Sequence, residues 1–190
     1  MALNKQLKDI IDSDLHRYGY SCESQMRFMT KKECYGYRYS KVLRKCKWYR
    51  EHNNKILFLL ERVKLRMLSE KLGFQITYST QIGRGLYLGH MGSIVVNWKA
   101  VLGNNVNLAQ GVTIGQANGG NKDGVPHIGN NVWIGANATV VGGITIGDDV
   151  MIAPNTFVNF DVPPHSLVIM EKAKTVTRAN ATEHYVENRV

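Results

Sequence analysis

The chain has 190 residues, a formal net charge of +9 and 44% hydrophobic residues. These figures exclude a disordered tail and predict a soluble, basic, globular protein with enough apolar material for a core. The longest apolar run, 56–60, is far shorter than a membrane span, and the first residues lack the apolar stretch of a secretory signal. We therefore expect a cytoplasmic protein.

The positive charge is concentrated in the first part of the chain. Residues 1–73 contain 17 Lys and Arg against 8 Asp and Glu, whereas residues 74–190 contain 7 of each. The spacing of apolar residues changes at the same place. We therefore predict a basic helical segment over 1–73, a repeat domain over 74–170 and a C-terminal tail over 171–190, and thus an α+β fold.

Three helical patterns precede residue 73. In the first, Leu3, Leu7, Ile10, Ile11 and Leu15 are spaced as on one helix face, and Tyr18-Gly19-Tyr20 interrupts them. A second helix is expected between Ser24 and Arg50, weakened by Gly36. A third begins after Asn53-Asn54 and ends at Gly73 as its cap. Its apolar side consists of Ile56, Leu59, Leu60, Val63, Met67 and Leu68.

From residue 76 onward, large aliphatic residues recur every six positions, apart from a two-residue offset before Val96 and a loop before Ile128, and this period fits neither a helix nor simple strand alternation. These residues are Ile76, Ile82, Leu88, Val96, Leu102, Leu108, Ile114, Ile128, Ile134, Val140, Ile146, Ile152 and Val158, and Gly or Ala follows most of them. Such a period predicts a β-solenoid, in which short strands stack their aliphatic side chains inside and turn at tight corners. The segment 115–127 breaks the phase and is expected to leave the coil as an exposed loop.

Units of the form Ile-Gly-x-x-x-x resemble the hexapeptide-repeat acyltransferases. The segments GRGLYLGHMGSIVV, LAQGVTIG and IGNNVWIGANATVVGGITIG are similar to serine acetyltransferases and to related enzymes of surface-polysaccharide synthesis. The resemblance covers residues 74–176. It implies a left-handed parallel β-helix that forms homotrimers and binds acetyl-CoA in clefts between neighbouring coils.

The resemblance places the catalytic base of the family on His90. A hydroxyl is a poor nucleophile at neutral pH, so a neutral imidazole is needed to accept its proton as it attacks the thioester carbonyl. The alternative is that His90 only completes a tight turn, which the adjacent Gly89 and Gly92 would also suit.

Three departures from the serine acetyltransferase pattern concern the acceptor. This chain has Gly89 where those enzymes have Asp, Gly124-Val125-Pro126-His127-Ile128 where they have Arg-His-Pro-Lys-Ile, and Gln75 where a second Asp pairs with the base. No carboxylate occurs between Glu70 and Asp123, so a backbone carbonyl, Tyr78, Gln75 or a neighbouring subunit would orient His90.

We therefore predict O-acetylation of a nucleotide-linked or lipid-linked sugar hydroxyl in surface-polysaccharide synthesis. The alternatives are a serine O-acetyltransferase of cysteine biosynthesis and a non-catalytic solenoid scaffold. His127 could contact the acceptor or the coenzyme, or be merely solvated.

The predicted acetyl-CoA groove is formed by small residues that let the ligand approach the backbone, with cations for its phosphates. They are Gly135, Ala136, Gly142, Gly143 and Ala153, together with Lys172 and Lys174. No metal is expected, because His90, His127 and His165 are too dispersed for a zinc site. Three cysteines, Cys22, Cys34 and Cys46, lack metal-site spacing and are expected to be reduced.

The basic helical segment is expected to cap the coil or to form oligomer contacts. Its cations and aromatic residues could also attract the inner face of an anionic membrane, although a solvated helix face is the simpler interpretation. The residues in question are Lys31, Lys32, Lys41, Arg44, Lys45, Lys47 and Arg50 with Tyr39, Trp48 and Tyr49. Nucleic-acid binding is not expected, because no recognition motif accompanies them.

Overall fold

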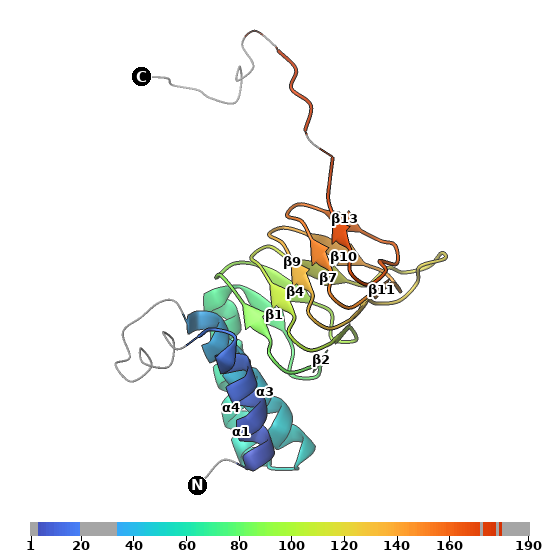
Figure 1. Ribbon diagram of the computed structural model, residues 1–190. Helices are drawn as coiled ribbons and strands as arrows, with labels where there is room; N and C mark the ends of the chain where they lie inside the picture. Colours follow the sequence, from blue (N-terminus) through green and yellow to red (C-terminus); the bar gives the residue numbers. More distant parts are fainter. Residues whose placement is uncertain (1–3, 20–33, 172, 178, 180–190) are drawn as a thin grey trace, which may run out of the picture.

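The computed structural model describes residues 4–19, 34–171, 173–177 and 179. Within these residues, helices α1 (Lys5–His16), α3 (Tyr35–Glu51) and α4 (Lys55–Leu72) form a layer at one end of a parallel β-solenoid (Figure 1). The strands are β1 (Phe74–Ile76), β2 (Gln81–Ile82), β3 (Tyr87–Leu88), β4 (Ile94–Val96), β5 (Val101–Leu102), β6 (Asn107–Leu108), β7 (Thr113–Gly115), β8 (His127–Ile128), β9 (Trp133–Ile134), β10 (Thr139–Val141), β11 (Thr145–Ile146), β12 (Met151–Ile152), β13 (Phe157–Val158) and β14 (Leu167–Val168).

Every third strand pairs in parallel with its counterpart one coil away, which gives three sheets. Their orders are β1-β4-β7-β10-β13, β11-β8-β5-β2 and β14-β12-β9-β6-β3. The register places one six-residue position above the next, as in the stack of Leu102, Ile128 and Ile146. All thirteen aliphatic residues of the six-residue pattern are buried. The β-solenoid predicted from their period is therefore confirmed.

Asparagine forms many of the corners between the sheets. Asn105, Asn131 and Asn137 have φ between 56° and 59°, a left-handed conformation that asparagine tolerates better than most residues. Their side chains also form ladders from coil to coil, as between Asn105 and Asn131 at 3.0 Å. His165 occupies a similar corner with φ of 57°, and its ring lies 2.8 Å from the Asp149 carboxylate.

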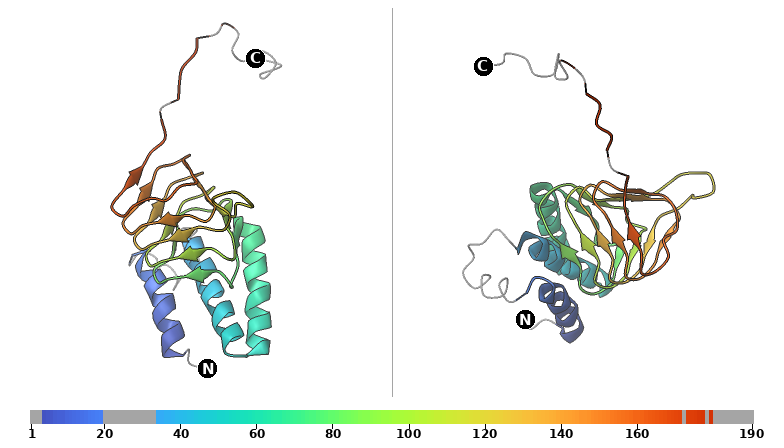
Figure 2. Two further views of the ribbon diagram at one scale, coloured as in Figure 1. Left: turned by 90° about the vertical axis from the view of Figure 1, so that its right-hand side faces the viewer. Right: turned by 45° about the horizontal axis from the view of Figure 1, so that its top comes forward.

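Between β7 and β8 the chain leaves the coils in a loop, which protrudes from the solenoid (Figure 2). The backbone N–H of Gly143 donates to the carbonyl of Lys122 at 2.9 Å, and the Lys122 ammonium lies 2.6 Å from the Asp161 carboxylate. The loop is thus fixed to the following coil by both backbone and side-chain contacts.

The helical layer is attached to the first coil by a buried ion pair. Asp14 on α1 and Arg44 on α3 are 0% and 4% exposed and are joined by two hydrogen bonds of 3.0 Å. Arg44 also donates to the carbonyl of Ile82, and Asp14 accepts from the backbone N–H of Leu86. Burial of Arg44 corrects its assignment to a surface cation, because its charge is used inside the protein.

Helices α3 and α4 differ in detail from the sequence patterns. Gly36 lies inside α3, where a Cβ atom would overlap the Leu88 carbonyl oxygen, so this glycine permits close packing instead of weakening the helix. Helix α4 ends at Gly73, whose φ of 74° confirms the predicted cap. Its apolar side faces outward, and its buried residues are Glu61, Leu65 and Leu72.

Further sequence expectations concern cysteines and membrane spans. Cys34 is disulfide-bonded, which corrects the expectation of reduced cysteines; sequence spacing alone carries no signal for pairing outside short motifs. Cys46 is free and buried. Leu3, Lys31 and Lys32 lie outside the described residues. Among the residues that the structure describes, no helix is both long and apolar enough to cross a membrane.

Candidate active site

His90 lies in the turn that carries the chain from β3 to β4, and its side chain is exposed. The turn is fixed on both sides of the histidine. The N–H of Gly89 donates to the carbonyl of Leu108 at 3.3 Å, and that of Gly92 donates to the carbonyl of Leu72 at 3.0 Å. Gly92 has φ of 138°, which side-chain-bearing residues rarely adopt. An anchored turn therefore presents the imidazole to the outside of the coil.

The imidazole borders a cleft of about 280 Å³ that runs along the outer side of successive coils, where Tyr87, Asn107 and Trp133 stack in register. The lining is neutral throughout and combines two aromatic rings with two amides. It consists of Tyr87, Gly89, His90, Asn107, Leu108, Ala109, Gln110, Trp133, Ala136 and Pro154. Such a lining can hold hydroxyl groups by neutral hydrogen bonds and a ring by aromatic contact, but it offers no side-chain charge to an ionic group.

The C-terminal end of α1 supports one wall of this cleft. The Tyr18 hydroxyl accepts from the N–H of Leu88 at 2.9 Å, and its ring lies 4.5 Å from that of Tyr87. Burial raises the pKa of Tyr18 well above its usual range, so the hydroxyl stays protonated. Arg17 donates to the Oδ1 atom of Asn107 at 2.6 Å. The helical layer therefore positions two residues of the cleft.

This support could not be predicted from the sequence, because Arg17 and Asn107 are 90 positions apart and belong to no shared motif. It also did not single out Tyr87, Asn107, Gln110 or Trp133 as site residues. Three of them directly precede a buried aliphatic residue of the repeat, and Gln110 lies at the corner after one. This placement could have indicated that their side chains point outward, but it does not show that they line one cleft.

The predicted orienting residues lie elsewhere within the single chain. Gln75 and Tyr78 line a different cavity, of about 500 Å³, together with Arg62 of α4 and Trp98. Within the described part of the chain, no side chain forms a hydrogen bond or ion pair with the His90 ring. Among the described residues, no backbone carbonyl forms a hydrogen bond with this ring either.

The other predicted acceptor contact and one coenzyme contact are also separated from His90. His127 is exposed on β8, in the sheet of β2, β5 and β11, and does not line the cleft. Lys174 is exposed after the last coil. Lys172 lies outside the described residues, so its predicted contact with the coenzyme is not described by the structure.

Of the small residues assigned to acetyl-CoA, Ala136 lines the cleft beside His90. Gly135 is buried, and a Cβ atom there would lie 2.6 Å from the backbone nitrogen of Pro154, so stacking of the coils already requires a glycine. Gly142 and Gly143 contact the loop residues Lys122 and Asp123. Ala153 is half-buried on the last full coil. Their contact with the coenzyme stays a prediction.

A metal centre has no candidate here: among the described residues, no three His, Cys, Asp or Glu side chains gather in an arrangement that could hold an ion.

Comparisons with known proteins support a hexapeptide repeat and show similarity over a longer part of the chain. Residues 126–159 match the family model described as bacterial transferase hexapeptide (six repeats). A serine acetyltransferase of Helicobacter pylori is 38% identical over 106 residues, which are 56% of this chain and 62% of that protein. A putative colanic acid biosynthesis acetyltransferase of Escherichia coli, WcaB, is 35% identical over 102 residues, which are 54% of this chain and 62% of that protein.

The similarity extends to the helical layer in three dimensions. The crystal structure of Neisseria gonorrhoeae serine acetyltransferase in complex with serine superposes with a TM-score of 0.68 and 30% sequence identity, covering 90% of this chain and 70% of that one. The chain spans 62% of the length of the Helicobacter enzyme. On this fold, repeat and identity, the chain belongs to the serine acetyltransferase family of hexapeptide-repeat transferases.

Proposed function

We propose that the protein transfers the acetyl group of acetyl-CoA to a hydroxyl of a sugar acceptor, with His90 as general base. The proposal is carried by the cleft beside His90, whose lining has no charged side chain. An amino acid brings an ammonium and a carboxylate, and both lose hydration on binding, so a site for it needs opposite charges. A sugar needs only hydrogen-bonding groups and an apolar or aromatic surface.

The chemistry needs one proton acceptor. The imidazole of His90 takes the proton of the acceptor hydroxyl as its oxygen attacks the thioester carbonyl carbon. When the tetrahedral intermediate collapses, the carbon–sulfur bond breaks and the imidazolium returns the proton to the sulfur of coenzyme A. Tyr87 and Trp133 would bound the acceptor, while the amides of Asn107 and Gln110 would bind its other hydroxyls.

L-Serine is the second candidate acceptor, and the names of the relatives favour it over a sugar. The serine acetyltransferase of Helicobacter pylori is 38% identical to this chain, and WcaB, whose name refers to colanic acid biosynthesis, is 35% identical. Serine would require charged groups that this cleft does not supply from the described part of one chain.

We further propose a homotrimer in which a second subunit closes the cleft and orients His90. The exposed side chain of His90 and its lack of a partner within the described chain support this arrangement. Exposed apolar side chains on the outer surface of the last coils, including Met151, Phe157 and Leu167, offer surface for subunit contact.

The test is a competition between acceptors. Purified protein is incubated with acetyl-CoA and either L-serine or a panel of nucleotide-linked and lipid-linked sugars, and coenzyme A release is measured together with the mass of the acetylated product. We expect sugar acetylation with kcat/KM at least tenfold above that for serine. Efficient formation of O-acetylserine would overturn the sugar proposal in favour of the second candidate. If neither serine nor any sugar of the panel is acetylated, both proposed classes of acceptor are overturned.

A further inference from the structure

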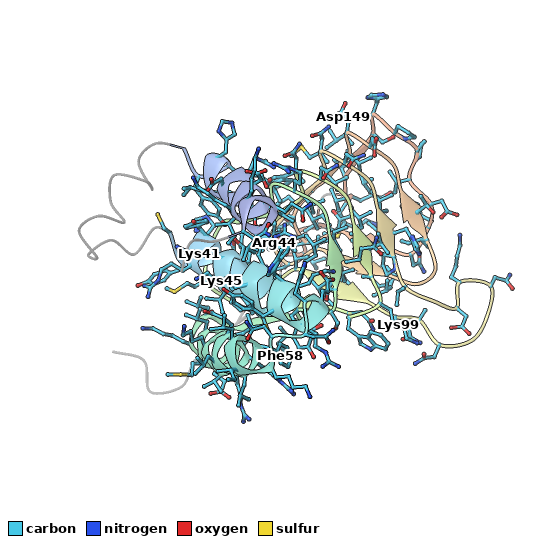
Figure 3. All side chains as sticks on the ribbon, turned by 90° about the horizontal axis from the view of Figure 1, so that it is seen from below. Lys41, Arg44, Lys45, Phe58, Lys99 and Asp149 are labelled. Carbon is cyan, nitrogen blue, oxygen red and sulfur yellow. The ribbon has the colours of Figure 1, made fainter. Side chains whose placement is uncertain are left out.

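The outward side of α4 is an apolar stripe without a partner in the described chain. Five large apolar side chains are between 52% and 76% exposed there, namely Ile56, Leu59, Leu60, Val63 and Met67. They recur at intervals of three and four residues, so they share one helix face over roughly 16 Å. Below this face α4 packs on α3 and β1, and Figure 3, where Phe58 marks α4, shows its outer side chains directed away from the solenoid.

Cations flank the stripe on both sides. At 100° per residue, Lys64 and Lys71 lie along one flank, and Lys55, Arg62 and Arg66 along the other. All five are exposed. Of the two carboxylates on α4, Glu61 is buried and lies 3.1 Å from the Lys64 ammonium, and Glu70 is paired with Arg66 at 3.0 Å, which leaves Lys55, Arg62 and Lys71 without a carboxylate of this helix. The exposed face thus combines an apolar centre with a clear excess of positive charge.

We propose that this face of α4 docks on a membrane surface bearing anionic lipid headgroups. A helix with a central apolar stripe and cationic flanks can lie in the plane of a bilayer, its apolar residues among the acyl-chain boundary and its cations at the phosphates. Each element of that arrangement is present here on a helix that the fold already holds at the molecular surface.

A second copy of this chain fits the same face poorly. A two-fold contact would bring the same patch of each copy together, so the five cations of one helix would face the five of the other. Only Glu70 among the exposed residues of α4 could compensate them, and it already has a partner. The charges of α4 therefore favour an anionic surface over a two-fold contact between copies, and a contact within the proposed homotrimer is an outcome of the test below.

The inference is independent of the acceptor and of His90, since none of these α4 residues lines the cleft. It would nevertheless matter for function, because docking would hold the cleft of a cytoplasmic-side enzyme close to substrates carried by lipids. It also differs from attraction through the basic α3 stretch, in which Arg44 is buried.

The test is sedimentation of the full-length protein with vesicles, either of phosphatidylcholine alone or of equal parts phosphatidylcholine and phosphatidylglycerol, at low and high salt. We expect partition into the anionic vesicles to exceed that into the neutral ones at least tenfold and to fall as salt screens the charges. The double variant Leu59→Ser and Val63→Ser should lower partition at least tenfold. Lys71→Gln removes a cation that no carboxylate of α4 pairs with, and it should lower partition about fivefold.

Val176→Ser is the matched control, because this side chain is 82% exposed in the segment after the last coil and lies outside the stripe. It should leave partition unchanged. Circular dichroism and light scattering of each variant in vesicle-free solution establish that fold and oligomeric state are intact. Equal partition of parent and serine variant, or no binding of the parent at low salt, overturns the proposal. A serine variant that changes oligomeric state also overturns it, because the stripe is then a contact between copies.

Discussion

The buried ion pair between Asp14 and Arg44 provides the sharpest prediction about stability. Replacing Asp14 with Ala removes two hydrogen bonds of 3.0 Å from Arg44 and one of 2.9 Å from the N–H of Leu86. Arg44, only 4% exposed, is then left with its charge buried and without its carboxylate. Breaking a buried pair in this way costs about 3–5 kcal/mol, whereas a typical domain has a stability of about 5–15 kcal/mol.

The assay is urea unfolding monitored by circular dichroism at fixed protein concentration. We expect Asp14→Ala to lower the free energy of unfolding by about 3–5 kcal/mol, while Asp12→Ala, an exposed aspartate on the same helix, changes it by less than about 0.5 kcal/mol. The double variant Asp14→Leu with Arg44→Met should recover most of the loss, because no charge stays buried. A loss below about 1 kcal/mol for Asp14→Ala would refute the reasoning.

Three further predictions concern single side chains. Burial raises the pKa of the Cys46 thiol to about 11, so its reaction with a disulfide reagent near neutral pH should be far slower in the native protein than in urea. The neutral thiol contributes fully to stability below the thiol pKa of the unfolded chain, and this contribution is lost as pH rises toward about 11. Equal reaction rates would contradict this burial. Arg17→Met frees the Asn107 amide, and we expect the acceptor KM to rise about threefold to tenfold with a smaller change in kcat; an unchanged KM in steady-state assays would remove Arg17 as a positioning residue. Hydrogen bonds from Lys122 and from a backbone N–H lower the pKa of Asp161. The attachment of the loop should therefore persist above the usual aspartate pKa and weaken as pH falls through the lowered pKa of Asp161. An NMR titration in which Lys122→Gln leaves the pKa of Asp161 unchanged would contradict this role of Lys122.

The solenoid could be predicted from the sequence because its rule is local and repeated. Each six-residue unit places one aliphatic side chain inside the coil. A shift of the repeat by one residue would turn side chains such as those of Leu108 and Ile134 toward solvent. Repetition therefore supplied many independent observations of one structural rule.

The docking of the helices could not be predicted in the same way. Whether Arg44 is buried depends on Asp14, 30 residues away, and on two carbonyls of the first coil. The apolar pattern of α4 indicated a helix, but its larger apolar side points outward, because packing on α3 and β1 uses Glu61, Leu65 and Leu72. A helical period shows that a face exists and does not show which neighbour covers it.

The candidate site could be predicted from the sequence in part. His90 was indicated by the resemblance, and Ala136 lines the same cleft. Within one chain, the cavity that Gln75 and Tyr78 line is a different one, and His127 lies on strand β8 of another sheet. Matching this sequence to the family pattern does not show which sheet or cavity a residue joins after folding. The wall that contains Tyr87 and Asn107 depends on α1, which shares no motif with the repeats.

The acetyl-CoA turnover of His90→Ala tests the central claim most directly. His90 is exposed, and its ring forms no hydrogen bond or ion pair with the described residues, so the variant should keep the circular dichroism spectrum and oligomeric state of the parent. Loss of a general base should lower kcat/KM for coenzyme A release by about 10²–10⁴-fold. A folded variant that releases coenzyme A at the parental rate with the same acceptor would contradict the account.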